Sequence, residues 1–470
     1  MGLGLHGGGL AVAKFLAKRG AQVTVTDLKT AKQLAKSLKQ LKGHKIRYVL
    51  GKHQLADFVK ADMVIKNPGV HGPNKFLEAA GKNHVPIETD LSLFFQLCPS
   101  QKTIGITGTK GKSTTSSLVY EIIKAYDRQA ILGGNIRISP LDYLSKIKKD
   151  TPVVLELSSW QLEGLKNIKV SPHYALVTNV LRDHLNTYSG MADYSQAKAL
   201  IFAFQNQSDF AVLNKDNADT RAMAKKVKSH LYWYSLKKLG AKENGAYLDK
   251  GWLVFKKGNK KSSFALASAK TSKAIEDKEK IISVKDIQLK GAHNLSNISG
   301  AISLTKIFGV PSAIIKKVVS NFKGIEGRLE LIREFNKIKY YNDTTATTPD
   351  AVIAALNTLG KNIVLLAGGT DKKLEFKELA KTIKNKVQAL ILFKGTATDK
   401  LIKELRKINY RKDLVLVISM TEAFKAAKKI LKPADIFLLS PGAASFGIFI
   451  NEFDRGEQFN QAIRKLGSKS

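Results

Sequence analysis

The sequence has little of what marks secreted or membrane proteins. Its single cysteine, Cys98, excludes an intramolecular disulfide and fits a reducing compartment. No stretch approaches the roughly 18 consecutive apolar residues that a membrane helix needs. The N-terminus also lacks a charged segment followed by an apolar run and a cleavage site. We therefore expect a cytoplasmic protein that does not contact a membrane.

Acidic residues are scarce as well, with 39 Asp and Glu against 77 Lys and Arg, which gives a formal net charge of +38. Such a surface attracts polyanions, including nucleic acid. However, the lysines are spread along the chain and no nucleic-acid-binding motif accompanies them. In segment 30–42 the leucines fall on one helical face and the lysines mostly elsewhere, which predicts a packed helix with a solvated lysine face. We expect no specific nucleic-acid partner.

What the 470 residues do contain is a repeated alternation of apolar strands and helical patterns. Such alternation is typical of parallel sheets covered by helices. We predict an α/β fold with three domains: a Rossmann-like domain at 1–98, a central P-loop ATPase-type domain at 99–324 and a Rossmann-like domain at 325–470. Within the second domain, segment 245–260 predicts a hairpin and the lysine-rich segment 260–280 a surface insertion.

The glycine-rich start matches the pattern G-x-G-x-x-G at Gly2, Gly4 and Gly7, and Asp27 closes the next strand. Such glycines let the backbone approach a diphosphate at a helix N-terminus, and the acid can bind a ribose hydroxyl. The motif normally follows a strand, but only Met1 precedes it here. Either the first strand is absent or the true start lies upstream. The ligand would be a nucleotide diphosphate such as a UDP-sugar, or NAD, or the turn is purely structural.

The segment IGITGTKGKSTT, residues 104–115, is similar to a phosphate-binding loop between a strand and a helix. The standard spacing requires a glycine at position 106, whereas the chain has Gly105 and Gly108. The other parts of the loop remain, so backbone amides and the helix N-terminus can hold phosphates. Lys112 can reach the β- and γ-phosphates, and Ser113 can hold Mg²⁺.

The loop GTKGKST resembles that of the Mur ligase family, whose members join an acid to an amine with the use of ATP. The segments GAHNLSNISGA and IEGRLE resemble further parts of the family's ATP site. The ATP-binding residues that the resemblance implies are Gly108, Thr109, Lys110, Gly111, Lys112, Ser113, Thr114, Asn294, Arg328 and Asp343.

Three other segments resemble the family's metal-binding parts. Glu156 ends an apolar strand and would bind Mg²⁺, because a carboxylate suits a hard cation. His184 would be a metal ligand, although a lone histidine is more often structural. Lys198 would be a carbamylated lysine whose negative charge supports a second Mg²⁺; the alternative is an ordinary surface lysine. The implied catalytic set is Lys112, Glu156, His184 and Lys198, and the last three form with Ser113 the implied metal set for two ions.

The outer domains resemble the branch of the family that adds D-glutamate to UDP-N-acetylmuramoyl-L-alanine. The segments NDTTATTPDA, GGTDKK and SPGAASF carry this resemblance, and the D-N-P-R segment of diamino-acid-adding members is missing. The implied D-glutamate-binding residues are Thr347, Lys372, Ser445 and Phe446, and Phe449 and Arg455 match as well. The implied UDP-substrate-binding residues are Gly4, Leu5, His6, Asp27, Asn67 and Asn135.

The resemblance thus implies an ATP-dependent amide ligase that forms an acyl phosphate and then a peptide bond to D-glutamate. Its partners would be small-molecule substrates, its cofactors ATP and Mg²⁺, and its state a monomer. Two alternatives stay open. The chain could be a family member that adds a different amino acid, or a basic nucleotide-binding ATPase of another class.

Overall fold

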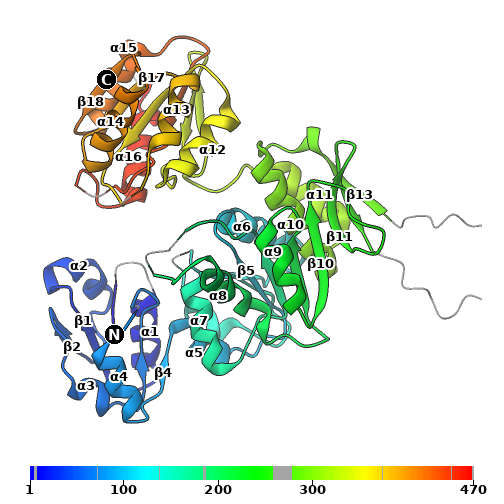
Figure 1. Ribbon diagram of the computed structural model, residues 1–470. Coiled ribbons are helices and arrows are strands. Elements are labelled where there is room, and N and C mark those ends of the chain that lie inside the picture. The colour runs from blue at the N-terminus through cyan, green and yellow to red at the C-terminus, as the bar shows by residue number, and fades with distance from the viewer. Residues whose placement is uncertain are drawn as a thin grey trace, which may run out of the picture. The chain divides into compact units, whose positions relative to one another are not determined.

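The computed structural model describes residues 1–4, 8–70, 72–136, 138–183, 187–257, 278–372, 374–445 and 447–467. The chain forms two compact units, Met1–Phe322 and Lys323–Ser470, both drawn as ribbons in Figure 1. The fold is α/β, as predicted, and its sheets are mainly parallel. Among the described helices, none combines the length and the apolar character needed to cross a membrane.

The amino-terminal part of the first unit contains two small parallel sheets, β1–β2 and β3–β4. The main chain at Met1 and Gly2 connects them, since Gly2 N donates to Thr26 O at 2.8 Å and Asn67 N donates to Met1 O at 2.9 Å. Met1 and Gly2 therefore pair as residues of a strand would. The elements of this part are α1 (Gly8–Lys18), β1 (Val23–Asp27), α2 (Ala31–Gln40), β2 (Ile46–Leu50), α3 (Ala56–Val59), β3 (Val64–Ile65), α4 (Lys75–Lys82), β4 (Ile87–Glu88) and α5 (Asp90–Leu97).

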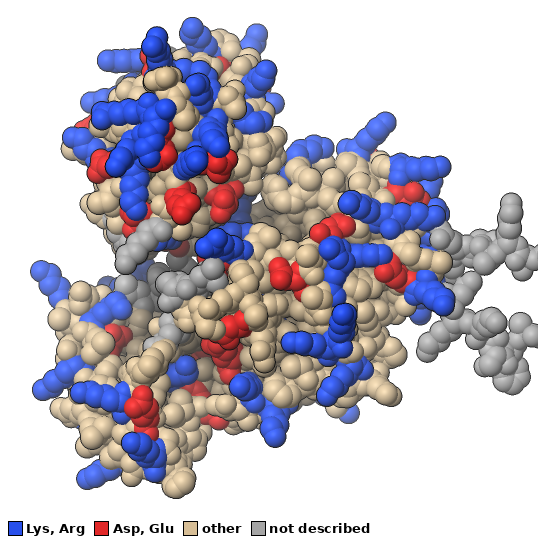
Figure 2. All heavy atoms as spheres, viewed as in Figure 1, with Lys and Arg blue, Asp and Glu red and all other residues tan. Residues whose placement is uncertain are grey.

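The lysine-rich segment 30–42 forms the predicted helix, α2. Leu34 and Leu41 are buried, whereas Lys32, Lys36 and Lys39 are exposed. On the face seen in Figure 2, Lys and Arg are scattered and acidic residues lie between them. This distribution is that of a solvated surface.

The central part of the first unit is a nine-stranded sheet in the order β13-β12-β11-β10-β9-β8-β5-β7-β6. Its strands are parallel from β6 to β11, and β11, β12 and β13 are antiparallel. The predicted hairpin is β11–β12, while residues 260–277 of the predicted insertion at 260–280 lie outside the described residues. Helices α6, α10 and α11 pack on one face of the sheet, and α5, α7 and α8 pack on the other.

The elements of this central part are β5 (Thr103–Thr107), α6 (Lys112–Tyr126), β6 (Ile131–Gly134), η1 (Pro140–Lys146), β7 (Val153–Glu156), α7 (Ser159–Ile168), β8 (Tyr174–Val177), α8 (Met191–Ala203), β9 (Phe210–Asn214), α9 (Ala218–Met223), η2 (Ala224–Lys226), β10 (His230–Ser235), β11 (Gly245–Asp249), β12 (Trp252–Lys256), β13 (Lys278–Ser283), η3 (Val284–Asp286), α10 (Ala292–Phe308) and α11 (Ser312–Asn321). The loop after β5 therefore lies at the carboxyl end of a strand that has parallel neighbours on both sides. This is where open α/β sheets bind their ligands.

The second unit is a six-stranded sheet in the order β14-β15-β19-β16-β17-β18, parallel except for the β14–β15 pair. The apolar runs of β16 and β17 are buried almost throughout, as expected for inner parallel strands. Its elements are β14 (Glu330–Phe335), β15 (Ile338–Asn342), α12 (Pro349–Leu359), β16 (Ile363–Gly368), α13 (Lys377–Lys386), β17 (Val387–Phe393), α14 (Thr396–Lys407), β18 (Leu414–Val417), α15 (Met420–Ile430), β19 (Ile436–Leu439) and α16 (Glu452–Arg464).

Candidate active site

The phosphate-binding loop joins β5 to α6, as predicted. Gly108 and Gly111 have φ values of +147° and +86°, which favour glycine, and a Cβ atom on either would collide with a neighbouring side chain. Gly105, the glycine that departs from the standard spacing, lies inside β5 and packs against Pro172. The irregular spacing therefore leaves the loop itself intact.

The segment after the neighbouring strand β8 holds the loop in place. The Asn179 side chain accepts a hydrogen bond from Lys110 N at 2.9 Å, and Thr178 Oγ1 donates to Lys110 O at 2.7 Å. Thr109 N donates to Asn179 O at 2.8 Å. Neither residue was predicted from the sequence; the available signal was the pair of polar side chains directly after an apolar strand.

Two lysine amines converge on one carbonyl oxygen of the loop. Lys112 Nζ donates to Gly108 O at 2.9 Å, and Lys198 Nζ donates to the same oxygen at 3.0 Å. Lys198 is only 1% exposed and lies over the Tyr194 ring. Its burial, with the charges of Lys112 and Lys110 nearby, lowers the pKa of Lys198 to about 6. Lys198 is thus no ordinary surface lysine, and its amine is largely neutral at pH 7.

Glu156 is a buried acid at the end of β7, next to β5. It is 1% exposed, and its Oε1 accepts a hydrogen bond from Asn135 Nδ2 at 3.0 Å while Ser116 Oγ lies 3.4 Å from Oε2. Within the described part of the chain, Glu156 has no basic partner within 4.0 Å. A buried carboxylate without a counter-charge is unfavourable, so a bound cation fits here.

The few protein ligands near Glu156 fit Mg²⁺, which does not need a complete set of protein ligands. No cluster of three or more His, Cys, Asp or Glu residues that could hold a metal occurs among the described residues. Mg²⁺ usually takes one or two carboxylates and completes its shell with phosphate oxygens and water. Glu156 and the hydroxyl of Ser113 are the residues that could supply such a partial set. His184 lies outside the described residues.

Two more residues assigned to ATP lie on helices beside the loop. Thr114 is buried in the first turn of α6. Asn294 is buried in the first turn of α10, and its side chain donates to Lys290 O at 2.7 Å. One turn further along α10, Asn297 packs against Gly111. Asn297 was not predicted as a site residue, although it lies in the segment GAHNLSNISGA quoted above.

At the glycine-rich start, Asp27 orders the turn. Its Oδ2 accepts from Gly4 N at 3.1 Å and its Oδ1 from Lys29 N at 2.9 Å, and the residue is buried. The Asn67 side chain packs against Gly2 and Gly4, so three of the six residues predicted to bind the UDP substrate, Gly4, Asp27 and Asn67, come together. Two predicted residues, Leu5 and His6, lie outside the described part of the chain. Asn135 lies instead beside Glu156.

In the second unit, main-chain hydrogen bonds join the three segments predicted to bind D-glutamate. Gly442 N donates to Ala346 O at 2.8 Å, and Thr370 and Ala444 exchange two hydrogen bonds of 3.0 Å. These hydrogen bonds lie close to the predicted residues in the sequence: Thr347 follows Ala346, Ser445 follows Ala444, and Lys372 lies two residues after Thr370. Ser445 is buried, Thr347 is half-buried and Lys372 is exposed. Phe446 lies outside the described residues.

Asp343 connects the turn that carries Arg328 to the end of β19. Asp343 Oδ1 accepts from Leu329 N at 3.0 Å, and Oδ2 accepts from Ser440 Oγ at 2.7 Å. Burial raises the pKa of Asp343 to about 7, although these two hydrogen bonds and the Arg328 charge act in the opposite direction. Both carboxylate oxygens are thus engaged in holding the turn.

Comparisons with known proteins agree with this picture. Three family models match the chain: the Mur ligase MurD-like N-terminal domain at 1–89, the Mur ligase middle domain at 106–305 and the Mur ligase glutamate ligase domain at 327–442. These matches fit the predicted three-domain layout. The middle-domain match begins at the last residues of β5 and so includes the phosphate-binding loop.

Curated relatives match over the whole chain. The protein named UDP-N-acetylmuramoylalanine–D-glutamate ligase from Roseiflexus sp. (strain RS-1) is 41% identical over 99% of this chain and 98% of its own. The protein of the same name from Borreliella afzelii (strain PKo) is 39% identical over 99% and 97%. Among solved structures, the UDP-N-acetylmuramate–alanine ligase MurC of Thermotoga maritima has a TM-score of 0.60 at 21% identity and covers 98% of both chains. The last likeness concerns the fold alone.

Proposed function

This chain belongs to the Mur ligase family, and from that premise we propose that it adds D-glutamate to UDP-N-acetylmuramoyl-L-alanine in an ATP-dependent reaction. The observation that carries this function is that two relatives, 41% and 39% identical over 99% of this chain, have names that specify this ligation. The reaction is an ADP-forming amide ligation in the synthesis of peptidoglycan precursors, and so a step of cell-wall formation.

We assign the phosphates of ATP to the loop between β5 and α6. Its glycine conformations and the N-terminus of α6 support this assignment, since free main-chain amides at a helix start attract phosphate. Lys112 would neutralise charge that develops on the transferred phosphoryl group. Asn294, Arg328 and Asp343 would complete nucleotide binding. For Asp343, the two hydrogen bonds described above favour a role in positioning the Arg328 turn.

The chemistry would run in two steps. The alanine carboxylate of the UDP substrate attacks the γ-phosphorus of ATP, which gives an acyl phosphate and ADP. The amine of D-glutamate then attacks the acyl carbon, and the amide forms as phosphate leaves and the amine loses a proton. The acyl phosphate would hydrolyse in water, so the site must exclude water during the second step.

Glu156 and Ser113 would hold one Mg²⁺ together with phosphate oxygens, and His184 and Lys198 would hold a second. When bound, Mg²⁺ neutralises phosphate charge and orients the reacting oxygens. Lys198 would act as a ligand as a carbamate, because Mg²⁺ is a hard cation that prefers carboxylate-type oxygens to an amine nitrogen. The lowered pKa of Lys198 supports this, since the neutral amine is the form that attacks CO₂.

The two remaining substrates would bind at the other two sites described above. D-Glutamate is assigned to the joined segments of the second unit, with Thr347, Lys372, Ser445 and Phe446 as its contacts. The UDP group is assigned to the glycine-rich start, with Gly4, Leu5, His6, Asp27 and Asn67. Asn135 is also assigned to the UDP substrate, and because it donates a hydrogen bond to Glu156, we propose that it orients this carboxylate as well. We place the reaction in the cytoplasm, where ATP is available, and expect a monomer.

Phosphate release tests this function directly. The 470-residue chain is incubated with ATP, Mg²⁺ and UDP-N-acetylmuramoyl-L-alanine, and with D-glutamate, L-glutamate, L-lysine or no amine. Release that depends on D-glutamate, with a product heavier by one glutamyl residue, is the expected result. Turnover with another amine would keep the family and overturn the specificity. Hydrolysis that no amine stimulates would favour an ATPase of another class.

A further inference from the structure

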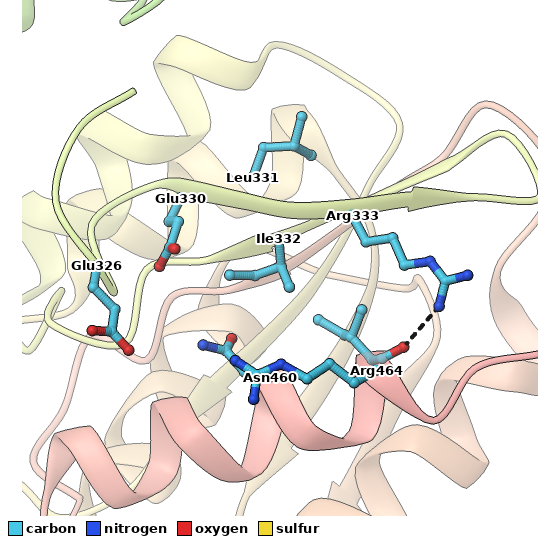
Figure 3. A pocket seen from close by; sticks show the side chains of 8 residues that line it. Glu326, Glu330, Leu331, Ile332, Arg333, Asn460 and Arg464 are labelled. Carbon is cyan, nitrogen blue, oxygen red and sulfur yellow. Dashed lines mark hydrogen bonds between the residues drawn. The ribbon is translucent and has the colours of Figure 1, made fainter. Parts of the chain in front are cut away.

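A cavity of about 520 Å³ lies in the second unit between β14 and α16, and Figure 3 shows the side chains that line it. Its charged groups are open to solvent or engaged in packing. Glu326 is exposed, and the side chain of Arg464 is 68% exposed. Arg333 donates to Leu466 O at 2.9 Å and so joins the strand to the end of the helix. This cavity is therefore a solvated gap between two elements and not an enclosed binding site.

The side chain of Thr109, in the phosphate-binding loop, is engaged entirely within the protein. The residue is 6% exposed. Its Oγ1 accepts a hydrogen bond from Leu181 N at 3.0 Å, and Leu181 O lies 3.4 Å away. The Tyr194 hydroxyl lies 3.3 Å from the same Oγ1. A threonine hydroxyl accepts two hydrogen bonds and donates one, so these contacts use its full capacity and leave none for a nucleotide.

The contact to Leu181 fixes the segment that leads from β8 toward His184. The preceding residue, Val180, is held by a different element, since its main chain bonds the side chain of Asn217, the N-cap residue of α9. Val180 N donates to Asn217 Oδ1 at 3.3 Å, and Asn217 Nδ2 donates to Val180 O at 3.1 Å. The main chain is thus held at two consecutive residues, the second of which lies three positions before His184. Thr109 provides the hold nearest to that histidine in the sequence.

The contact to Tyr194 leads to Lys198. The two residues are four positions apart on α8, so their side chains share one face of the helix. Lys198 Nζ lies 4.4 Å from the centre of the Tyr194 ring and donates to Gly108 O at 3.0 Å. Burial raises the pKa of Tyr194 to about 12, so its hydroxyl keeps the proton that it can donate to Thr109. Because Gly108 precedes Thr109, the four residues form a closed ring of contacts around the lysine amine.

Two other buried threonines on β5 show what a purely structural hydroxyl does here. Thr107 Oγ1 donates to Leu157 O at 2.7 Å, and Thr103 Oγ1 accepts from His173 N at 3.2 Å. Each of these contacts joins β5 to the main chain that follows or precedes a neighbouring strand. Thr109 differs from both, because its partners lead to the two positions assigned to the second Mg²⁺.

We propose that Thr109 is a positioning residue for the second Mg²⁺, because its hydroxyl fixes both Lys198 and the segment leading to His184 relative to the phosphate-binding loop. This inference rests on the proposed function, which assigns these two residues to that ion. Ligands from separate segments need a common support, and such outer partners are typically worth about 10–100-fold in metal affinity or activity. Since Thr109 belongs to the loop assigned to the phosphates, the nucleotide and both metal-binding segments share one point of support.

Binding of Mn²⁺, which replaces Mg²⁺ and is counted by electron paramagnetic resonance, tests the proposal. The 470-residue chain is titrated in the presence of ADP and bicarbonate, and we expect two Mn²⁺ sites. Thr109→Val keeps the shape of the side chain without its hydroxyl, and it should weaken one site by about tenfold or more while the other changes by less than about twofold. Thr109→Ser keeps the hydroxyl and should bind both ions within about threefold of the unchanged chain.

Thr103→Val is the matched control. It also removes a buried hydroxyl that accepts a main-chain N–H, but at the other end of β5. Both Mn²⁺ sites should therefore keep their affinity in this variant. Tyr194→Phe removes one of the contacts of Thr109 and leaves the Leu181 contact in place, so its loss should be smaller than that of Thr109→Val.

Initial rates of ligation give a second measurement. Thr109→Val should lower kcat by about tenfold or more, as expected for an outer partner of metal ligands. The KM for ATP should change far less, because Thr178 and Asn179 still hold the loop. A merely structural role would instead raise the KM for ATP along with the loss in kcat.

Several results would overturn the proposal. These are a single Mn²⁺ site in the unchanged chain, unaltered Mn²⁺ binding in Thr109→Val, equal losses in Thr109→Val and Thr103→Val, and a loss in Thr109→Ser as large as that in Thr109→Val. Melting curves of each variant exclude misfolding as the cause of a loss. The titrations contain neither the UDP substrate nor D-glutamate, so their failure leaves the proposed ligation untouched. Normal Mn²⁺ binding in an unchanged chain that forms no product would instead overturn the proposed reaction.

Discussion

The two units hold a basic side chain against main-chain oxygens at the carboxyl end of a sheet, but in different ways. Lys112 donates to Gly108 O and Thr109 O and remains partly exposed. Arg455 donates to Thr344 Oγ1 at 3.1 Å and Thr344 O at 2.9 Å and is completely buried. The partly exposed Lys112 can contact a phosphate group of a ligand. The buried Arg455 cannot reach a ligand and can only hold the loops that it contacts in position. Burial thus separates a contact residue from a scaffold residue of the same charge.

The strongest test of this contrast is Lys112→Ala. If the accessible amine neutralises the transferred phosphoryl group, kcat should fall by about a thousandfold or more, as for other preorganised charges at a reacting centre. Phosphate release coupled to product mass measures it. Lys124→Ala, at the exposed end of the same helix, is the matched control and should keep its activity. Near-normal ligation by Lys112→Ala would show that the phosphate assignment is wrong.

Lys198 should be the next most sensitive residue. Lys198→Arg places a permanently charged side chain at this position and cannot form a carbamate, so activity should fall on the order of a hundredfold, the upper end of the cost of losing a group that supports a metal site. Because the pKa of Lys198 is about 6, its amine is protonated below that pH and cannot attack CO₂. Bicarbonate-dependent activity should therefore decline as pH falls through 6.

A ¹³C NMR carbamate signal from labelled bicarbonate measures the same event directly. The signal should disappear in Lys198→Arg. Lys256→Arg, a change at another buried lysine, is the control and should retain it. A carbamate signal of equal strength in both variants would place the modification elsewhere.

The sequence predicted these elements unevenly. The phosphate loop is one continuous segment in which strand, glycines, lysine and helix follow each other, so local patterns identify it. The residues that hold it, Thr178 and Asn179, are about 70 positions away and become neighbours only because β8 pairs with β5. The burial of Arg455 could not be predicted from the sequence either, since a helix with Glu452, Asp454 and Arg455 in its first turns has the pattern of an exposed helix. Long-range pairing and burial are set by tertiary packing, which local patterns do not contain.

Replacing the buried Arg455 should lower the stability of the protein more than it changes the catalytic step. Arg455→Met leaves Thr344 O and Ala443 O without their donor, which should lower the free energy of unfolding by about 3 kcal/mol. It should also raise the KM for D-glutamate, because the two loops lose their connection. Denaturant unfolding and initial rates measure the two effects. Lys465→Met, at the exposed end of α16, is the control; an equal loss in both variants would contradict a scaffold role for Arg455.

The smallest expected effect concerns Ser440, which donates to Asp343 beneath the Arg328 turn. The pKa of Asp343 rises from 3.8 to about 7 on folding, so the folded state binds more protons between these values and stability falls as pH rises through that window. The Ser440 hydrogen bond favours the charged carboxylate and limits this loss. Ser440→Ala should therefore lower the free energy of unfolding by about 1 kcal/mol at pH 8 and by less at pH 6. Unfolding in denaturant at both pH values measures this, with Asp343→Asn as the background. If the pH dependence of the Ser440→Ala effect persisted in Asp343→Asn, the carboxylate would not be its source, and the link from Ser440 to the turn would have to be abandoned.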